Sequence, residues 1–162
     1  MTENAIGEGL ERRKLLKLLL SGPLLLTTSS LHAQTAPAPG RVFGSDAGMI
    51  LNTIKPEKTA DFEIVIERLK AALSASTDPV RKQQAAGWKV FKALEPGGNN
   101  TVLYVFWINP AVKGADYTVS KILYEAFPND VPDLYQKFSG AYAGGQTMVN
   151  LQLLSAMGPS AV

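Results

Sequence analysis

Thr101-Val-Leu-Tyr-Val-Phe-Trp-Ile108 is the stretch of sequence that decides the fold. Its β-branched and aromatic residues favour a strand, and Asn109-Pro110 ends it. Another β-prone run, residues 88–94, comes before it. Residues 95–100, which include Pro96, Gly97 and Gly98, separate the two runs. Such residues form turns. We therefore predict that the two strands form an antiparallel hairpin.

Helical patterns flank this hairpin on both sides. Apolar residues recur at three- and four-residue spacing over 59–76 and again over 119–127, which predicts one buried face on each helix. Pro128 interrupts the second helix. We expect Asp130 to cap a further helical piece that ends at Gly144-Gly145.

Two outer strands, over 49–54 and 148–154, complete the order β-α-β-β-α-β. This order is typical of the ferredoxin-like α+β fold, a four-stranded antiparallel sheet with its helices on one face. The first and third strands are apolar at both parities, whereas a solvated sheet face alternates with polar residues. We therefore predict that both faces are buried and that two copies form a homodimer, with their sheets facing each other.

The first 33 residues have the features of an export signal. Arg12-Arg13 lies in a basic start, the apolar stretch 18–26 follows, and Ala33 offers a small residue at the cleavage point. The apolar stretch is much shorter than the about 20 residues of a spanning helix. The arginine pair resembles the twin-arginine export motif, and general secretion remains the alternative.

The predicted organisation follows from this signal. We expect a signal peptide over 1–33, a disordered linker over 34–46, the ferredoxin-like domain over 47–156 and a frayed C-terminus over 157–162. The linker contains two prolines among small residues. The protein is expected in the periplasm or outside the cell, with no stable membrane span after signal cleavage.

Composition excludes several chemistries. The chain has no cysteine, and its one histidine, His32, lies in the signal. Thiolate metal sites, thiol nucleophiles and Ser-His-Asp catalysis are therefore excluded from the mature protein. We predict no metal site and no cofactor. The formal net charge of +2 gives no electrostatic reason to expect nucleic acid as a partner.

The chain resembles the dimeric α/β barrel proteins of the antibiotic-biosynthesis-monooxygenase superfamily over about residues 47–155. The resemblance rests on the element order, on Ile54-Lys55-Pro56-x-Lys58 before the first helix, and on Trp107 late in the third strand. The haem-degrading branch uses an Asn on the first strand, which Asn52 matches, and a Trp on the third strand, which Trp107 matches. It also uses a His on the second helix as haem ligand, and this chain has no His there. Other branches act without a cofactor on polyphenolic substrates.

The candidate ligand-binding residues are amides and aromatic side chains of the predicted strands: Asn52, Tyr104, Trp107, Asn150 and Gln152. Asn52 is expected near Asn150 and Gln152 because the first and fourth strands are neighbours in this fold. The three amides would form either a polar patch in a pocket or an amide ladder at a dimer seam.

Two functions follow from these residues. The first is binding of a small apolar or aromatic ligand, or of a protein partner, without chemistry. The alternative is a cofactor-independent monooxygenase acting on a quinol-like substrate. No catalytic residue is assigned, so the sequence leaves open whether the protein is an enzyme.

Overall fold

The computed structural model describes residues 40–158. The predicted signal peptide over 1–33 and the first part of the predicted linker lie outside these residues. The helices and strands are β1 (Ala47–Ile54), η1 (Pro56–Lys58), α1 (Thr59–Ala75), α2 (Pro79–Gly87), β2 (Trp88–Lys92), η2 (Gly98–Asn100), β3 (Val102–Ile108), α3 (Val119–Ala126), α4 (Val131–Ala141) and β4 (Tyr142–Leu151).

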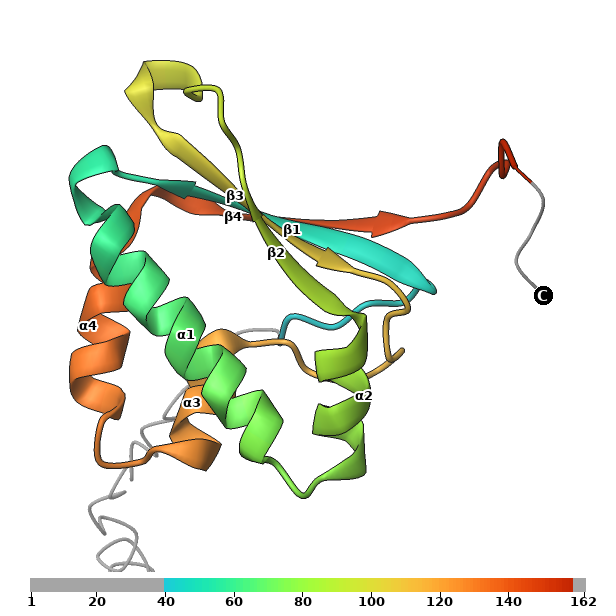
Figure 1. Ribbon diagram of the computed structural model, residues 1–162, viewed down its shortest axis with the longest axis horizontal. Helices are drawn as coiled ribbons and strands as arrows, with labels where there is room; N and C mark the ends of the chain where they lie inside the picture. Colours follow the sequence, from blue (N-terminus) through green and yellow to red (C-terminus); the bar gives the residue numbers. More distant parts are fainter. Residues whose placement is uncertain (1–39, 159–162) are drawn as a thin grey trace, which may run out of the picture. The chain divides into compact units, whose positions relative to one another are not determined.

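The four strands form one antiparallel sheet in the order β2-β3-β1-β4. The helices lie on one face of this sheet (Figure 1). This arrangement confirms the predicted ferredoxin-like α+β fold, including the hairpin between β2 and β3. The hairpin turns at Asn99 and Asn100, both with a φ of 56°, a left-handed conformation that asparagine tolerates better than most residues.

The core lies between the sheet and the helices. β1 and β3 each turn alternate residues toward the helices, among them Ile50, Ile54, Phe106 and Ile108, which are almost completely buried. Opposite them, α1 buries one apolar face: Phe62, Val65, Leu69, Ala72 and Leu73. This face agrees with the predicted helical pattern, and each large side chain in it contributes about 1.5–3 kcal/mol through burial.

α2 was not predicted from the sequence. Asp78 caps this helix by accepting a hydrogen bond from the Val80 backbone N–H at 2.9 Å, and Pro79 occupies its first turn. Its buried side chains include Arg81 and Gln84 rather than a run of apolar residues. A polar buried face gives no apolar periodicity, and for that reason the pattern did not reveal the helix.

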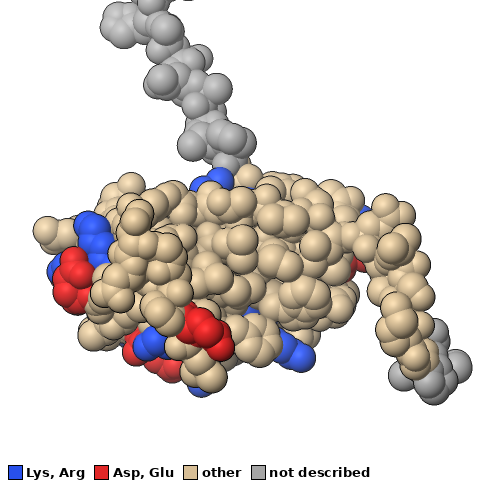
Figure 2. Space-filling model, turned by 90° about the horizontal axis from the view of Figure 1, so that it is seen from above, with Lys and Arg blue, Asp and Glu red and all other residues tan. Residues whose placement is uncertain are grey.

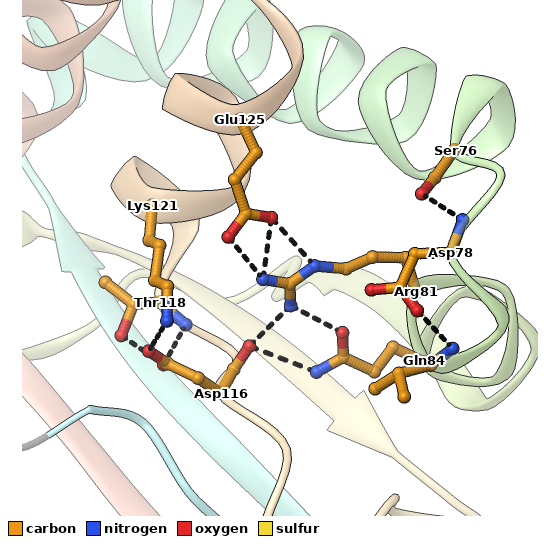
Figure 3. A network of polar contacts seen from close by, with 9 residues as sticks. Ser76, Asp78, Arg81, Gln84, Asp116, Thr118, Lys121 and Glu125 are labelled. Carbon is orange, nitrogen blue, oxygen red and sulfur yellow. Dashed lines mark hydrogen bonds and ion pairs between the residues drawn. The ribbon is translucent and has the colours of Figure 1, made fainter.

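Arg81 joins α2 to α3 and to the loop before α3, as Figure 3 shows. Its guanidinium donates to both carboxylate oxygens of Glu125, at 3.1 and 2.9 Å. It also donates to the Asp116 carbonyl and to the Gln84 side chain, both at 2.7 Å. Because Arg81 is buried, these acceptors replace the water that its charge loses.

β4 begins earlier in the chain than predicted. α4 ends at Ala141, and Gly144-Gly145, the expected helix end, lies within β4. The strand runs from Tyr142 to Leu151 rather than over 148–154. β4 therefore has six residues before Met148 that pair with β1 or lie beside it.

The predicted linker is too long at its C-terminal end. Phe43 is fully buried and meets the Tyr117 ring edge-on, with the ring centroids 5.2 Å apart. The neighbouring Val42 forms an isolated antiparallel bridge to Asp116. A Cβ at Gly48 would lie 2.2 Å from the Phe43 ring, so this close contact requires glycine. Packing in the domain therefore begins before Ala47.

The second face of the sheet has no helix over it in the described part of the chain. The alternate strand residues that point away from the helices form this face. Its large apolar residues are Met49, Leu51, Phe91, Leu103, Val105, Trp107, Val149 and Leu151, and Thr53, Lys89 and Thr147 lie among them or at the margin. We call this surface the open face. Figure 2 looks at the molecule from above the sheet and shows uncharged atoms across its centre, with the charged groups near the margins.

None of the helices within residues 40–158 combines the length and the apolar character that crossing a membrane requires.

Candidate functional site

A cavity of about 600 Å³ lies between α1, α2 and β2, on the helix side of the sheet. Its volume lies within the range of about 300–1,000 Å³ that is usual for small-molecule sites. Its walls are mainly apolar, and charged side chains from α1 and β2 lie at its rim. The lining residues are Glu63, Ile66, Glu67, Leu69, Lys70, Leu73, Ser74, Ala85, Trp88, Val90, Lys92 and Tyr104.

Strand alternation explains which residues of β2 line this cavity. Trp88, Val90 and Lys92 pair with Ile108, Phe106 and Tyr104 of β3, and these partners are buried toward the helices. β2 is an edge strand of the sheet, and α1 and α2 lie beside its helix-side face. The space between them is the cavity.

A polar triad of Tyr104, Glu63 and Lys92 forms one part of the cavity wall. The Tyr104 hydroxyl donates to Glu63 Oε1 at 2.6 Å, and Lys92 Nζ donates to the same oxygen at 2.8 Å. Lys92 Nζ also lies 5.5 Å from the centre of the Tyr104 ring. Within residues 40–158, Glu63 Oε2 accepts no hydrogen bond.

The triad favours an ionised Glu63. The hydrogen bond from Lys92, followed by the one from Tyr104, lowers the pKa of the Glu63 carboxyl below its usual value. Burial raises the pKa of the Tyr104 phenol, and the adjacent Glu63 raises it further. At neutral pH the triad therefore consists of a carboxylate, an ammonium and a neutral phenol.

Trp88 forms another part of the wall and has an unusual feature. Its indole Nε1 is buried, and nothing within residues 40–158 accepts its hydrogen bond. The ring packs against Phe106 and Tyr117, with centroid distances of 5.5 and 5.3 Å. A buried donor without an acceptor costs about 1–3 kcal/mol, so aromatic packing rather than hydrogen bonding holds this side chain.

Asn52 is fully buried, and its amide is satisfied by other groups of the chain. Its Nδ2 donates to the carbonyls of Ile50 and Tyr104, at 3.1 and 3.2 Å. Its Oδ1 accepts from the Tyr142 hydroxyl at 2.9 Å and from Gln146 Nε2 at 2.8 Å. Burial also raises the pKa of Tyr142. These contacts give Asn52 a structural role in joining β1 to β3 and β4.

The structure does not bring the three predicted amides together. The register places Gln146 opposite Asn52 and places Asn150 opposite Gly48. Asn150 accepts hydrogen bonds from the Gly44 backbone N–H and the Ser45 hydroxyl, at 2.9 and 3.0 Å. Gln152 is exposed beyond the end of β4. The expected amide cluster is therefore absent from the described residues.

The predicted aromatic residues lie on opposite faces of the sheet. Tyr104 lines the cavity, whereas Trp107 lies on the open face opposite Met49. Glu63 and Lys92 were not predicted as site residues. The sequence signal for Glu63 is a second stripe on α1, residues 63, 66, 67, 70 and 74, beside the buried apolar stripe that includes Leu73.

Within residues 40–158, no group of three or more acidic or histidine side chains is arranged to hold a metal ion.

Comparisons with known proteins show one weak structural similarity. No protein-family model matches the chain, and no curated protein matches it. A solved structure of a mutant of SnoaB, described as a cofactor-independent oxygenase from Streptomyces nogalater, aligns with 70% of this chain and 98% of its own. The identity is 11% and the TM-score is 0.37.

Replacing Lys92 by methionine should raise the pKa of Glu63, because the hydrogen bond from Lys92 is the largest cause of its lowering. The ionised form of Glu63 contributes stability above the carboxyl's unfolded pKa, and this contribution is lost as the pH falls through the lower folded pKa. A carbon-13 NMR titration of the Glu63 carboxyl would measure the change. An unchanged midpoint in Lys92→Met would contradict the triad, and Lys82→Met, on the exposed surface of α2, is the control.

Proposed function

We propose that the protein binds a small, mainly apolar or aromatic molecule in the cavity between α1 and β2. One observation supports this function above the others: a cavity of ligand size, walled by Ile66, Leu69, Trp88 and Val90, has the Tyr104–Glu63–Lys92 triad in its lining. Apolar walls with a few placed polar groups are the usual composition of small-molecule sites.

The charges of the lining favour an uncharged ligand. Glu63 and Glu67 are balanced by Lys70 and Lys92, so the formal charge of the cavity rim is close to zero. Glu63 Oε1 already accepts two hydrogen bonds, whereas Oε2 is free within the described residues. A carboxylate only accepts hydrogen bonds. A neutral ligand with a hydroxyl group would therefore match this part of the wall.

A bulky side chain introduced into the cavity should prevent binding. Ile66 lines the cavity, whereas Ile64 lies on the same helix with 49% of its surface exposed and outside the cavity. We expect Ile66→Trp to weaken binding of the neutral fluorescent probe N-phenyl-1-naphthylamine at least about tenfold, which corresponds to about 1.4 kcal/mol. Ile64→Trp should bind it as the unmodified protein does. Equal binding by both variants, or no binding by the unmodified protein, would contradict the proposal.

Oxygen uptake measured with quinols in an oxygen electrode, beside a binding titration with the same quinols, separates ligand binding from the oxygenase alternative. Neither Asn52 nor Trp107, the residues that match the haem-degrading branch, lines the cavity. We expect binding without oxygen uptake. Uptake that Ile66→Trp abolishes would instead identify the cavity as an oxygenase site.

We also propose that two copies associate through their open faces. This surface carries large, partly exposed apolar side chains on β1, β3 and β4, and contiguous apolar surfaces on a protein often mark interaction sites. Lys89 stands at its margin on β2, opposite Trp107. The homodimer would account for the apolar residues at both parities of β1 and β3.

Sedimentation equilibrium of the full chain tests the dimer. The chain has a mass of 17.4 kDa, and we expect a species of about twice this mass. Val105 lies at the middle of the open face, between Leu51 and Phe91. We expect Val105→Asp to give the monomer, because an unpaired charge would be buried in the interface. A monomeric unmodified protein would refute the dimer.

Export is part of the proposal and rests on residues 11–33 of the sequence. We expect the mature protein to begin at Gln34, which N-terminal sequencing of the exported material measures. Retention of an uncleaved chain in the cytoplasm would contradict this. Export that fails when Arg12 and Arg13 are both replaced by lysine would identify the twin-arginine route over general secretion.

A further inference from the structure

The chain continues beyond the sheet as an exposed apolar segment. Residues 152–157 follow β4, and we call them the C-terminal arm. Figure 1 shows the chain running on past the end of β4, away from the helices. Leu153, Leu154 and Met157 are 80%, 99% and 95% exposed. Three large apolar side chains so close together in a short segment are costly to leave in water.

β4 and the C-terminal arm also lack the charges that protect a free strand edge. The sheet has two edge strands, β2 and β4. β2 is short and carries Lys89 and Lys92, a common protection against pairing with another chain. β4 has ten residues, and no residue from 138 to 162 is charged. β4 and the C-terminal arm therefore lack the protection against another chain that β2 carries.

Strand alternation relates the C-terminal arm to the open face. Val149 and Leu151 pair with Met49 and Ala47, and their side chains belong to the parity of the open face. Continued by one step of two residues, this alternation puts Leu153 at the same parity. Extended backbone at residues 152 and 153 would therefore carry the apolar surface past Ala47, the first residue of β1, which pairs with Leu151 at the end of β4.

We propose that the C-terminal arm of each copy packs against the sheet of a second copy and is part of the dimer interface. This inference rests on the open-face dimer proposed above. Four strands about 4.8 Å apart and about seven residues long cover roughly 450 Å², whereas a stable interface buries about 800 Å² on each partner. Each large apolar side chain of the arm adds roughly 100 Å². The arms would therefore add apolar area to the interface beyond the footprint of the sheets.

Charges placed in the C-terminal arm test this role. In the full chain, the double variant Leu153→Asp/Leu154→Asp removes two apolar contacts, whereas Ser155→Asp/Ala156→Asp adds the same charge to the same segment. We expect the first pair to raise the dimer dissociation constant at least about tenfold in sedimentation equilibrium, and the second pair to change it by less than about threefold. Equal effects of the two pairs would overturn the arm's role.

The remaining outcomes distinguish a failure of the proposed arm contact from a failure of the proposed dimer. If Val105→Asp gives the monomer while Leu153→Asp/Leu154→Asp dimerises like the unmodified protein, the open-face dimer stands and the arm's role is refuted. If the unmodified protein is monomeric, both proposals fail. Near-ultraviolet circular dichroism on each variant checks that the domain remains folded.

A second measurement reports on the arm directly. The chain has no cysteine, so Leu154→Cys gives one labelling site for acrylodan, a dye whose emission shifts to the blue in apolar surroundings. We expect the emission to shift to the red on dilution, as the dimer dissociates and the arm becomes exposed. Emission that does not depend on concentration would overturn the proposal, whether the dye is exposed throughout or covered by its own chain.

Discussion

The structure depends on one constraint: all the helices within residues 40–158 lie on the same side of a sheet whose central strands, β1 and β3, are largely apolar on both sides. β1 and β3 turn Ile50, Ile54, Phe106 and Ile108 toward the helices, and this layer is the core. The same strands turn Met49, Leu51, Val105 and Trp107 the other way. The hydrophobic effect acts equally on both sets. Within residues 40–158 only the first set is covered by helices, and the proposed second copy would cover the other set.

The helix side of the sheet is also incompletely filled, and this gives the cavity. α1 packs against α2, α3 and α4, and its main apolar stripe faces the core. β2 lies at the edge of the sheet. α2 is held by the Arg81 network to α3 and to the loop that precedes it. The flank of α1 and the helix-side face of β2 therefore border an open cavity with polar groups from Tyr104, Glu63 and Lys92.

Much of the fold could be predicted from the sequence, because apolar periodicity set the hairpin, α1 and the order of the elements. α2 could not, because its buried residues Arg81 and Gln84 are polar. The site was harder to predict than the fold. The partner of Asn52 depends on where β4 begins, and a start at Tyr142 rather than Met148 places Gln146 beside it in place of Asn150. Glu63 and Lys92 meet only in three dimensions, across 29 residues of sequence.

In the proposed function the two faces of the sheet have separate roles, one in binding a ligand and the other in binding a second copy. The chain has two tryptophans: Trp88 lines the cavity and Trp107 lies on the open face. Their indole N–H signals in a nitrogen-15 NMR spectrum therefore report the two faces separately. Addition of N-phenyl-1-naphthylamine should shift the Trp88 signal alone, and dilution should shift the Trp107 signal alone. A probe that shifts Trp107, or a dilution that leaves Trp107 unchanged, would contradict this division.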